Sequence, residues 1–270
     1  MNTILLSSAI LGGMGLIAGI VLVIAYKKLK VEEDSRIEEI TALLPGINCG
    51  ACGYASCHDY AVNIVEKGAK PGACAPSGDG VSEKISEIVG VAVSAGEKKK
   101  AVVKCFTKER KMSALYVGRQ DCSSANQLGG GMLCKEGCLG LGDCAAVCPF
   151  DAIKMLPSGT AYTDYDRCTG CGICVASCPR KIIELVAPRE DKCVYVGCSN
   201  TQPAKETRQT CSSGCIACLL CVKKGPEGMF TINNNLSAVV SQPDTSFSLE
   251  QIKCAPGCIY ELSAGSKSKS

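Results

Sequence analysis

The chain contains few of the side chains on which most enzymes and most protein cores depend. Its 270 residues include one histidine, His58, no tryptophan and only four phenylalanines. Histidine is the commonest acid–base catalyst, and a single histidine in a chain is weak evidence for a catalytic site. Aromatic residues make up 4% of the chain, although such side chains dominate the energetics of most cores. The sequence therefore predicts no catalytic residue for a small-molecule substrate, and it requires another source of stability.

Signatures of nucleotide and nucleic-acid binding are also missing. No G-x-G-x-x-G run joins a predicted strand to a helix, and the glycines at residues 129–131 favour a turn over a phosphate loop. The formal net charge is +3, which gives no support for nucleic-acid binding. No cleavable signal peptide is evident either, because nothing basic precedes the first apolar run.

Cysteine, in contrast, is abundant, with 22 residues in the chain. The clearest run is Cys168-x2-Cys171-x2-Cys174-x3-Cys178, followed directly by proline. In ferredoxins, the first three thiolates of such a run ligate one iron–sulfur cluster, and the fourth, before proline, ligates the neighbouring cluster. The run therefore predicts several clusters and the transfer of single electrons.

Other uses of these cysteines fit the sequence less well. Disulfide frameworks belong to short domains in oxidising compartments, and this chain is long. Zinc sites favour two separated C-x-x-C pairs, often with histidine. Haem c needs C-x-x-C-H, and no cysteine lies three residues before Cys57, which precedes His58.

The amino terminus carries the longest apolar run. Residues 4–26 hold no charge, and Lys27, Lys28 and Lys30 come directly after them. The run is long enough to span a bilayer as one helix, and the positive-inside rule places the rest of the chain in the cytoplasm. We therefore predict a transmembrane anchor over residues 1–30, single-pass in the cell (inner) membrane, with the cluster domains in the cytoplasm. Gly15 and Gly19 form a GxxxG pair suited to a partner helix.

The first cysteine group has the spacing C-x2-C-x4-C-x16-C. It consists of Cys49, Cys52, Cys57 and Cys74. We expect these four thiolates to hold one cluster in a small domain over residues 31–100. Residues 31–40 favour a helical stalk, residues 55–68 favour a helix between ligands, and residues 81–93 fit either an amphipathic helix or a strand.

Residues 101–190 contain an internal repeat of the kind that marks duplicated units. Two Cys-Pro motifs, at Cys148 and Cys178, are each followed by an isoleucine five residues later. The repeat predicts a two-cluster ferredoxin-like domain in which each half has a short helix and flanking strands. By the crossed ligation of such domains, one cluster takes Cys148, Cys168, Cys171 and Cys174.

The second cluster of this domain departs from the motif. Leu141 occupies the position between Cys138 and Cys144 where a cysteine is expected. Either the cluster contains three irons, or a displaced cysteine supplies the missing ligand. We favour the second alternative, with Cys134 as the substitute and a cluster held by Cys134, Cys138, Cys144 and Cys178.

Residues 191–270 form a degenerate copy of the ferredoxin-like domain. The copy begins with Cys211-x3-Cys215-x2-Cys218-x2-Cys221, but Gly225 and Pro226 replace the next Cys-Pro motif. Cys254 precedes Ile259 by five residues, as in the two intact motifs. The spacing predicts one cluster, held by Cys215, Cys218, Cys221 and Cys254, with Cys258 at a packing position.

The remaining cysteines are Cys105, Cys122, Cys193, Cys198 and Cys211. They could be buried and inert, or four of them could hold one more cluster. We favour a set of Cys105, Cys122, Cys198 and Cys211, which leaves Cys193 free. Cys134 and Cys211 each lie four residues before a motif, so these two could exchange roles. The chain is thus predicted to be an α+β protein with about five 4Fe-4S clusters, roughly four to six.

The arrangement resembles the B subunit of the Rnf complex, a membrane-bound, ion-translocating electron-transfer machine. The resemblance covers nearly the whole chain and is most specific at residues 48–57 and 137–144, while the stretches around Cys105, Cys122 and Cys215 are similar to a longer form of the subunit in some anaerobes. It implies a subunit of a ferredoxin-dependent translocase that accepts electrons from soluble ferredoxin and passes them to other membrane subunits.

Two other functions are compatible with the motifs. One is a stand-alone membrane-anchored polyferredoxin, or a sensor. The other is the cluster subunit of an oxidoreductase with a soluble substrate, although the chain itself lacks a nucleotide-binding motif. A tethered row of clusters favours the relay subunit, because it is useful only between two fixed redox partners. The small positive net charge permits docking of an acidic ferredoxin.

Overall fold

The computed structural model describes residues 2–29, 34–78, 80–92, 98–189, 191–243 and 247–265. Short helices and short strands alternate along most of the chain, in agreement with the predicted α+β class. The helices are α1 (Asn2–Leu29), α2 (Ser35–Leu43), α3 (Cys57–Lys67), α4 (Val81–Val89), α5 (Cys122–Gln127), α6 (Asp143–Ala146), α7 (Ile173–Ser177), α8 (Ala204–Thr210), α9 (Leu220–Lys224) and the 3-10 helix η1 (Leu249–Gln251). The strands are β1 (Lys100–Val103), β2 (Ile153–Met155), β3 (Ala161–Thr163), β4 (Ile183–Val186), β5 (Lys192–Val196), β6 (Phe230–Asn233), β7 (Leu236–Val239) and β8 (Ile259–Ser263).

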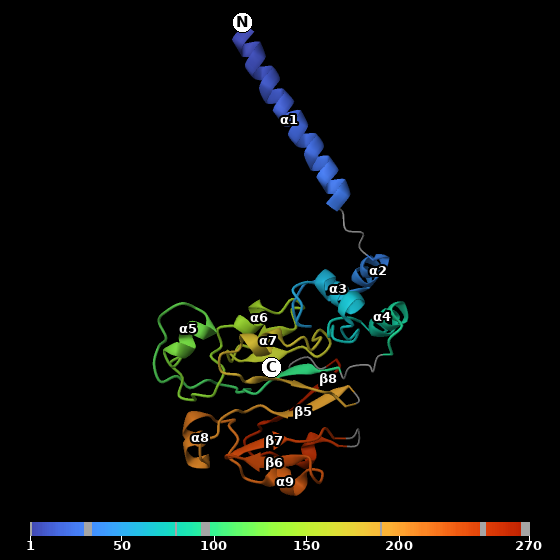
Figure 1. Ribbon diagram of the computed structural model, residues 1–270. Helices are drawn as coiled ribbons and strands as arrows, with labels where there is room; N and C mark the ends of the chain where they lie inside the picture. The colour runs from blue at the N-terminus through green and yellow to red at the C-terminus, as the bar shows by residue number, and fades with distance from the viewer. Residues whose placement is uncertain are drawn as a thin grey trace.

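Helix α1 points away from the remainder of the protein (Figure 1). Among the residues whose placement is described, no helix is both long enough and apolar enough to cross a membrane. The anchor predicted from residues 4–26 is therefore not confirmed and stays a prediction.

Helices α2, α3 and α4 form a small unit of their own between α1 and the strands (Figure 1). Asp34 caps α2 by accepting the backbone N–H of Arg36 at 3.0 Å, and Ile37 and Ile40 of that helix are buried against the unit's core. Helix α3 ends at Gly68, whose φ of 67° is readily adopted by glycine. The helix predicted over residues 55–68 is thus confirmed, and the open choice for residues 81–93 is resolved as a helix over Val81–Val89.

The next unit has the ladder pattern of a two-cluster ferredoxin. Strand β1 pairs antiparallel with β4, and β2 pairs antiparallel with β3. Helices α6 and α7 each lie within a cysteine run, with Cys144 in α6 and Cys174 in α7, and each precedes a strand, β2 and β4 respectively. Ala101, Ala152 and Ile183 pack with the motif cysteines in one hydrophobic core. The predicted repeat of a short helix with flanking strands is confirmed here.

The carboxyl-terminal unit repeats the same topology. Strand β5 pairs with β8 and β6 pairs with β7, both antiparallel. Helix α9 occupies the place of α6, and the 3-10 helix η1 occupies the place of α7. Each unit carries an insert after its first strand. The first insert lies between β1 and the motif loop that begins at Cys138, and it contains α5. The second lies between β5 and the motif loop that begins at Cys215, and it contains α8.

Candidate iron–sulfur sites

The N-terminal set consists of Cys49, Cys52, Cys57 and Cys74. Cys57 begins α3, and its backbone N–H donates to Oδ1 of Asn48 at 2.8 Å. Burial raises the pKa of the Cys74 thiol, and the Cys52 and Cys57 thiolates raise it further because they lie nearby. The helical unit therefore gathers at least three of its four cysteines around one point, and the fourth, Cys49, is half-buried.

This set is held by residues of one helical unit, so it should assemble separately. We expect Cys57→Ala to remove about four irons per chain, the content of one cubane, and to leave the clusters of the two ferredoxin-like units in place. Iron analysis with EPR of the reduced protein checks this. Cys193→Ala is the matched control, because Cys193 is a buried thiol that lines none of the cysteine-rich cavities of the two ferredoxin-like units. Loss of every cluster signal in Cys57→Ala would contradict the separation.

The first ferredoxin-like unit encloses two cysteine-lined cavities. The Cys148 cavity is lined by Cys148, Cys168, Cys171 and Cys174, together with apolar side chains. These are the four cysteines that the spacing predicted for one cluster. Backbone N–H groups already point at the sulfurs, since Ala101 donates to Sγ of Cys168 at 3.3 Å and Ala152 donates to Sγ of Cys148 at 3.4 Å. Such bonds stabilise cluster thiolates and tune their potentials.

The Cys178 cavity differs from the sequence prediction in one ligand. It is lined by Cys122, Cys138, Cys144 and Cys178, whereas Cys134 lies elsewhere. The backbone N–H of Leu141 hydrogen-bonds the sulfur of Cys122. Cys122 therefore occupies the neighbourhood of the missing motif cysteine, and it replaces Cys134 in this set.

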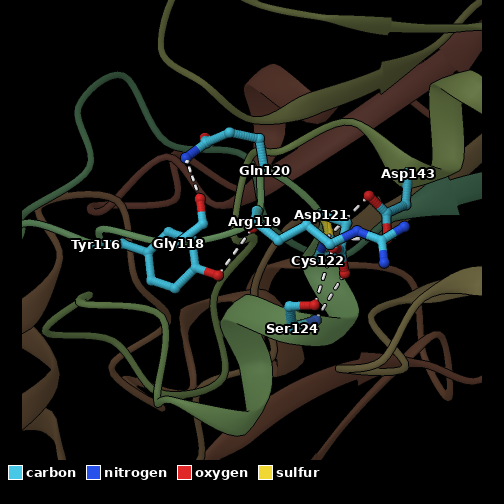
Figure 2. A network of polar contacts seen from close by, with 8 residues as sticks. All are labelled: Tyr116, Gly118, Arg119, Gln120, Asp121, Cys122, Ser124 and Asp143. Carbon is cyan, nitrogen blue, oxygen red and sulfur yellow. Dashed lines mark hydrogen bonds and ion pairs between the residues drawn. The ribbon is translucent and has the colours of Figure 1, made fainter.

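A network of polar contacts holds the backbone at Cys122 in place (Figure 2). Its backbone N–H donates to the carboxylate of Asp143, 3.0 Å from each oxygen. Asp121 caps α5 by accepting the N–H of Ser124 at 2.7 Å, and the guanidinium of Arg119 lies 2.9 Å from the Asp121 carboxylate. Because Asp143 precedes Cys144 in the motif, this contact links the first insert directly to the motif loop. No spacing rule reveals it, since the two partners are far apart in sequence.

A third cavity, here called the junction cavity, lies between the two ferredoxin-like units. Its cysteines are Cys105, Cys134, Cys198 and Cys211. The sequence predicted Cys105, Cys198 and Cys211 for the extra set, but with Cys122 as the fourth member. The structure thus exchanges Cys122 and Cys134 between the two predicted sets and leaves the other members unchanged.

The C-terminal cavity is lined by Cys215, Cys218, Cys221, Cys254 and Cys258. Its motif loop keeps the backbone of the intact motif although the glycines are lost. In the intact run, Gly170 and Gly172 have φ of 73° and 82°, and in this copy Ala217 and Leu219 take φ of 51° and 63°. A non-glycine residue with positive φ costs of order 1–3 kcal/mol and persists where its surroundings require it. The retained conformation supports a cluster-wrapping loop.

Within this cavity, Cys254 is the counterpart of a motif ligand and Cys258 is the additional thiol. The N–H of Cys258 hydrogen-bonds Sγ of Cys254, as the N–H of Ala152 does at Cys148. Cys258 is buried, and its sulfur lies 3.6 Å from that of Cys254. Hydrogen bonds from the Cys258 thiol lower the pKa of Cys215 and of Cys254 to about 6. Thiolates are the ligands that iron–sulfur clusters use, so both sulfurs are suited to ligation.

The cysteine sets follow one another closely through the protein. Burial raises the pKa of Cys171, and the thiolate of Cys49 adds to the effect, so the N-terminal set lies near the Cys148 cavity. Burial likewise raises the pKa of Cys144 to about 12, with a contribution from Cys174 across the two cavities of the first unit.

Cys193 is fully buried in β5, where burial raises its pKa to about 12.

Comparisons with known proteins agree with this description. The FeS family, which describes an Fe-S cluster, matches residues 44–76, and the 4Fe-4S dicluster domain matches residues 133–182. The chain is therefore an iron–sulfur protein with 4Fe-4S domains, although these matches do not fix the number of clusters.

Relatives along most of the chain define the family. The B subunit of the Na(+)-translocating ferredoxin:NAD(+) oxidoreductase complex of Acetobacterium woodii is 40% identical over 88% of this chain and 72% of its own length. The B subunit of the ion-translocating oxidoreductase complex of Methanosarcina acetivorans is 34% identical over 91% and 94%, respectively. The B subunit of the proton-translocating ferredoxin:NAD(+) oxidoreductase complex of Clostridium ljungdahlii is 35% identical over 98% and 95%. The chain belongs to the family of B subunits of ion-translocating oxidoreductase complexes, which confirms the resemblance seen in its motifs.

Proposed function

We propose that this chain is the electron-relay subunit of a membrane-bound, ion-translocating oxidoreductase. The observation that carries the proposal is the succession of cysteine sets along the chain, from the α2–α4 unit through the two ferredoxin-like units. Neighbouring sets lie close enough for their thiolates to affect one another's pKa. Such a succession suits stepwise electron transfer.

The donor sets fit 4Fe-4S clusters. Thiols and apolar side chains dominate the walls of the Cys148, Cys178 and C-terminal cavities, and backbone N–H groups point at several sulfurs. When bound, each cluster would accept and release one electron at a potential set by hydrogen bonds and solvent. The proposed ligands are all the cysteines except Cys193 and Cys258, which gives about five clusters.

The electron donor is soluble ferredoxin, and the acceptors are other membrane subunits of the complex. Two of the relatives carry ferredoxin and NAD(+) in their names, which supports this direction of electron flow. The proposed domains are the anchor over residues 1–30, the four-cysteine domain over 31–100, the two-cluster domain over 101–190 and the degenerate domain over 191–270.

The anchor would hold the cluster domains at the cytoplasmic face of the membrane. The uncharged run over residues 4–26 and the lysines directly after it support this orientation. Protease added outside intact cells should then leave residues 34–265 uncut. Digestion of that part would reverse the proposed topology.

Ferredoxin oxidation by membranes tests the function. Membranes from cells that carry the complete complex should oxidise reduced ferredoxin with NAD(+) as acceptor, and membranes lacking this chain should lose that activity. Restoring the wild-type chain or Cys193→Ala should restore the activity, since Cys193 is a buried thiol outside the proposed clusters. Full activity in membranes that lack the chain would refute the proposed role.

A further inference from the structure

The two ferredoxin-like units meet through their inserts. The backbone N–H of Phe106 donates to the carbonyl of Gly197 at 3.0 Å, and Oγ of Ser199 donates to the carbonyl of Lys104 at 2.8 Å. Each of these residues comes shortly after the first strand of its unit, β1 or β5. The junction cavity lies at this contact, and both inserts contribute to its walls.

The four cysteines of the junction cavity occupy equivalent positions in the two units. Cys105 lies two residues after the end of β1, and Cys198 lies two residues after the end of β5. Cys134 and Cys211 each precede the first motif cysteine of their unit, Cys138 and Cys215, by four residues. Each unit therefore supplies one matching pair of thiols to the same cavity.

The hydrogen bonds at the cavity repeat in the same way. The backbone N–H of Cys138 hydrogen-bonds the sulfur of Cys105, and the equivalent N–H of Cys215 donates to Sγ of Cys198 at 3.3 Å. The N–H of Asn200 also donates to Sγ of Cys198, at 3.4 Å. Backbone N–H groups that point at a sulfur stabilise its thiolate form, which is the form that ligates a cluster.

We propose that the junction cavity is a further cluster site, in which Cys105, Cys134, Cys198 and Cys211 ligate one 4Fe-4S cluster shared by the two repeated units. Three of these cysteines lie outside both family matches, and Cys134 lies at the edge of one. The site touches Cys138 of one unit and Cys215 of the other through these hydrogen bonds, so it joins the clusters of both units into one path. Its role in electron relay rests on the proposed function, whereas its ligand set does not.

Loss of one particular EPR signal tests the ligand set. In the full-length protein, purified without oxygen, Cys134→Ala and Cys211→Ala should each abolish the same cluster signal, with the same g-values and midpoint potential. In each single variant, the iron content should fall by about four atoms per chain or less. The double variant, Cys134→Ala with Cys211→Ala, should lose no more iron than either single variant. Cys122→Ala should abolish a different signal, the one that Cys178→Ala also removes. Cys193→Ala should keep every signal.

Three results would overturn the inference. Cys134→Ala and Cys211→Ala could abolish different signals, either variant could keep all of its iron, or either could lose every cluster at once. The last result counts against it because the other cavities use none of these four cysteines. All of these readouts are independent of ferredoxin oxidation, so a failure here is distinguishable from a failure of the proposed function.

Discussion

Cys122→Ser should convert the cluster of the Cys178 cavity into a three-iron form. Cys138, Cys144 and Cys178 would remain, and three thiolates do not complete the four ligands of a cubane. We expect the loss of about one iron per chain and a new three-iron EPR signal after mild oxidation. The other cluster signals should be unchanged, because Cys122 lines no other cysteine-rich cavity among those described.

A second substitution in the same chain tests whether a cysteine at the regular motif position can compensate for the loss of Cys122. Leu141 occupies the motif position that Cys122 replaces, and its N–H already contacts the Cys122 sulfur. In the double variant Cys122→Ser with Leu141→Cys, the regular motif is restored, so the full iron content and the original signal type should return. Leu141→Cys in the wild-type background is the control and should keep all irons. Cys122→Ala leaves no side-chain atom that can ligate iron, so an unchanged cluster inventory in that variant would show that Cys122 is not the displaced ligand.

Cys254→Ser should remove the cluster of the C-terminal cavity, while Cys258→Ala should not. Cys254 receives the same backbone hydrogen bond as Cys148, and Cys258 lies where the intact motif has the packing residue Ala152. We expect Cys254→Ser to lose up to about four irons per chain and Cys258→Ala to keep its full content. Iron and sulfide analysis with EPR of both variants measures this.

The comparison of these two variants also decides between the two sulfurs. They lie 3.6 Å apart, so either could reach a cluster in the cavity. The opposite pattern, in which Cys258→Ala loses the cluster and Cys254→Ser keeps it, would reverse the assignment. Alanine at position 258 reproduces Ala152 of the intact motif, so the variant leaves a side chain that the fold accommodates at the equivalent position.

Sequence reasoning predicted those parts of the structure that depend on local spacing. The set of Cys148, Cys168, Cys171 and Cys174 follows from a regular motif, because adjacent turns of such a loop bring the thiolates together. The helix over residues 55–68 and the repeated strand ladders followed in the same way. For the carboxyl-terminal unit, the sequence predicted a degenerate copy of the domain. It did not predict that both antiparallel strand pairs are kept there.

The exchange of Cys122 and Cys134 lay beyond spacing rules. Cys122 reaches its cavity through α5 and the carboxylate of Asp143, a contact between segments 21 residues apart. Cys134 is nearer to the motif in sequence, but its insert turns it towards the other unit. One sequence signal did point to the observed set, namely the equal spacing of Cys134 and Cys211 before their motifs. The strained backbone of Ala217 and Leu219 carried no sequence signal, because only the fold shows that they keep the glycine conformation.

We expect the chain to hold an unbroken succession of about five clusters. The most direct measurement is the iron and acid-labile sulfide content of the full-length protein, purified and reconstituted without oxygen, together with an EPR-monitored redox titration. We expect about twenty irons and a matching amount of sulfide per chain, with separable cubane signals. A fully reconstituted protein with about eight irons or fewer, the content of roughly two cubanes, would contradict it.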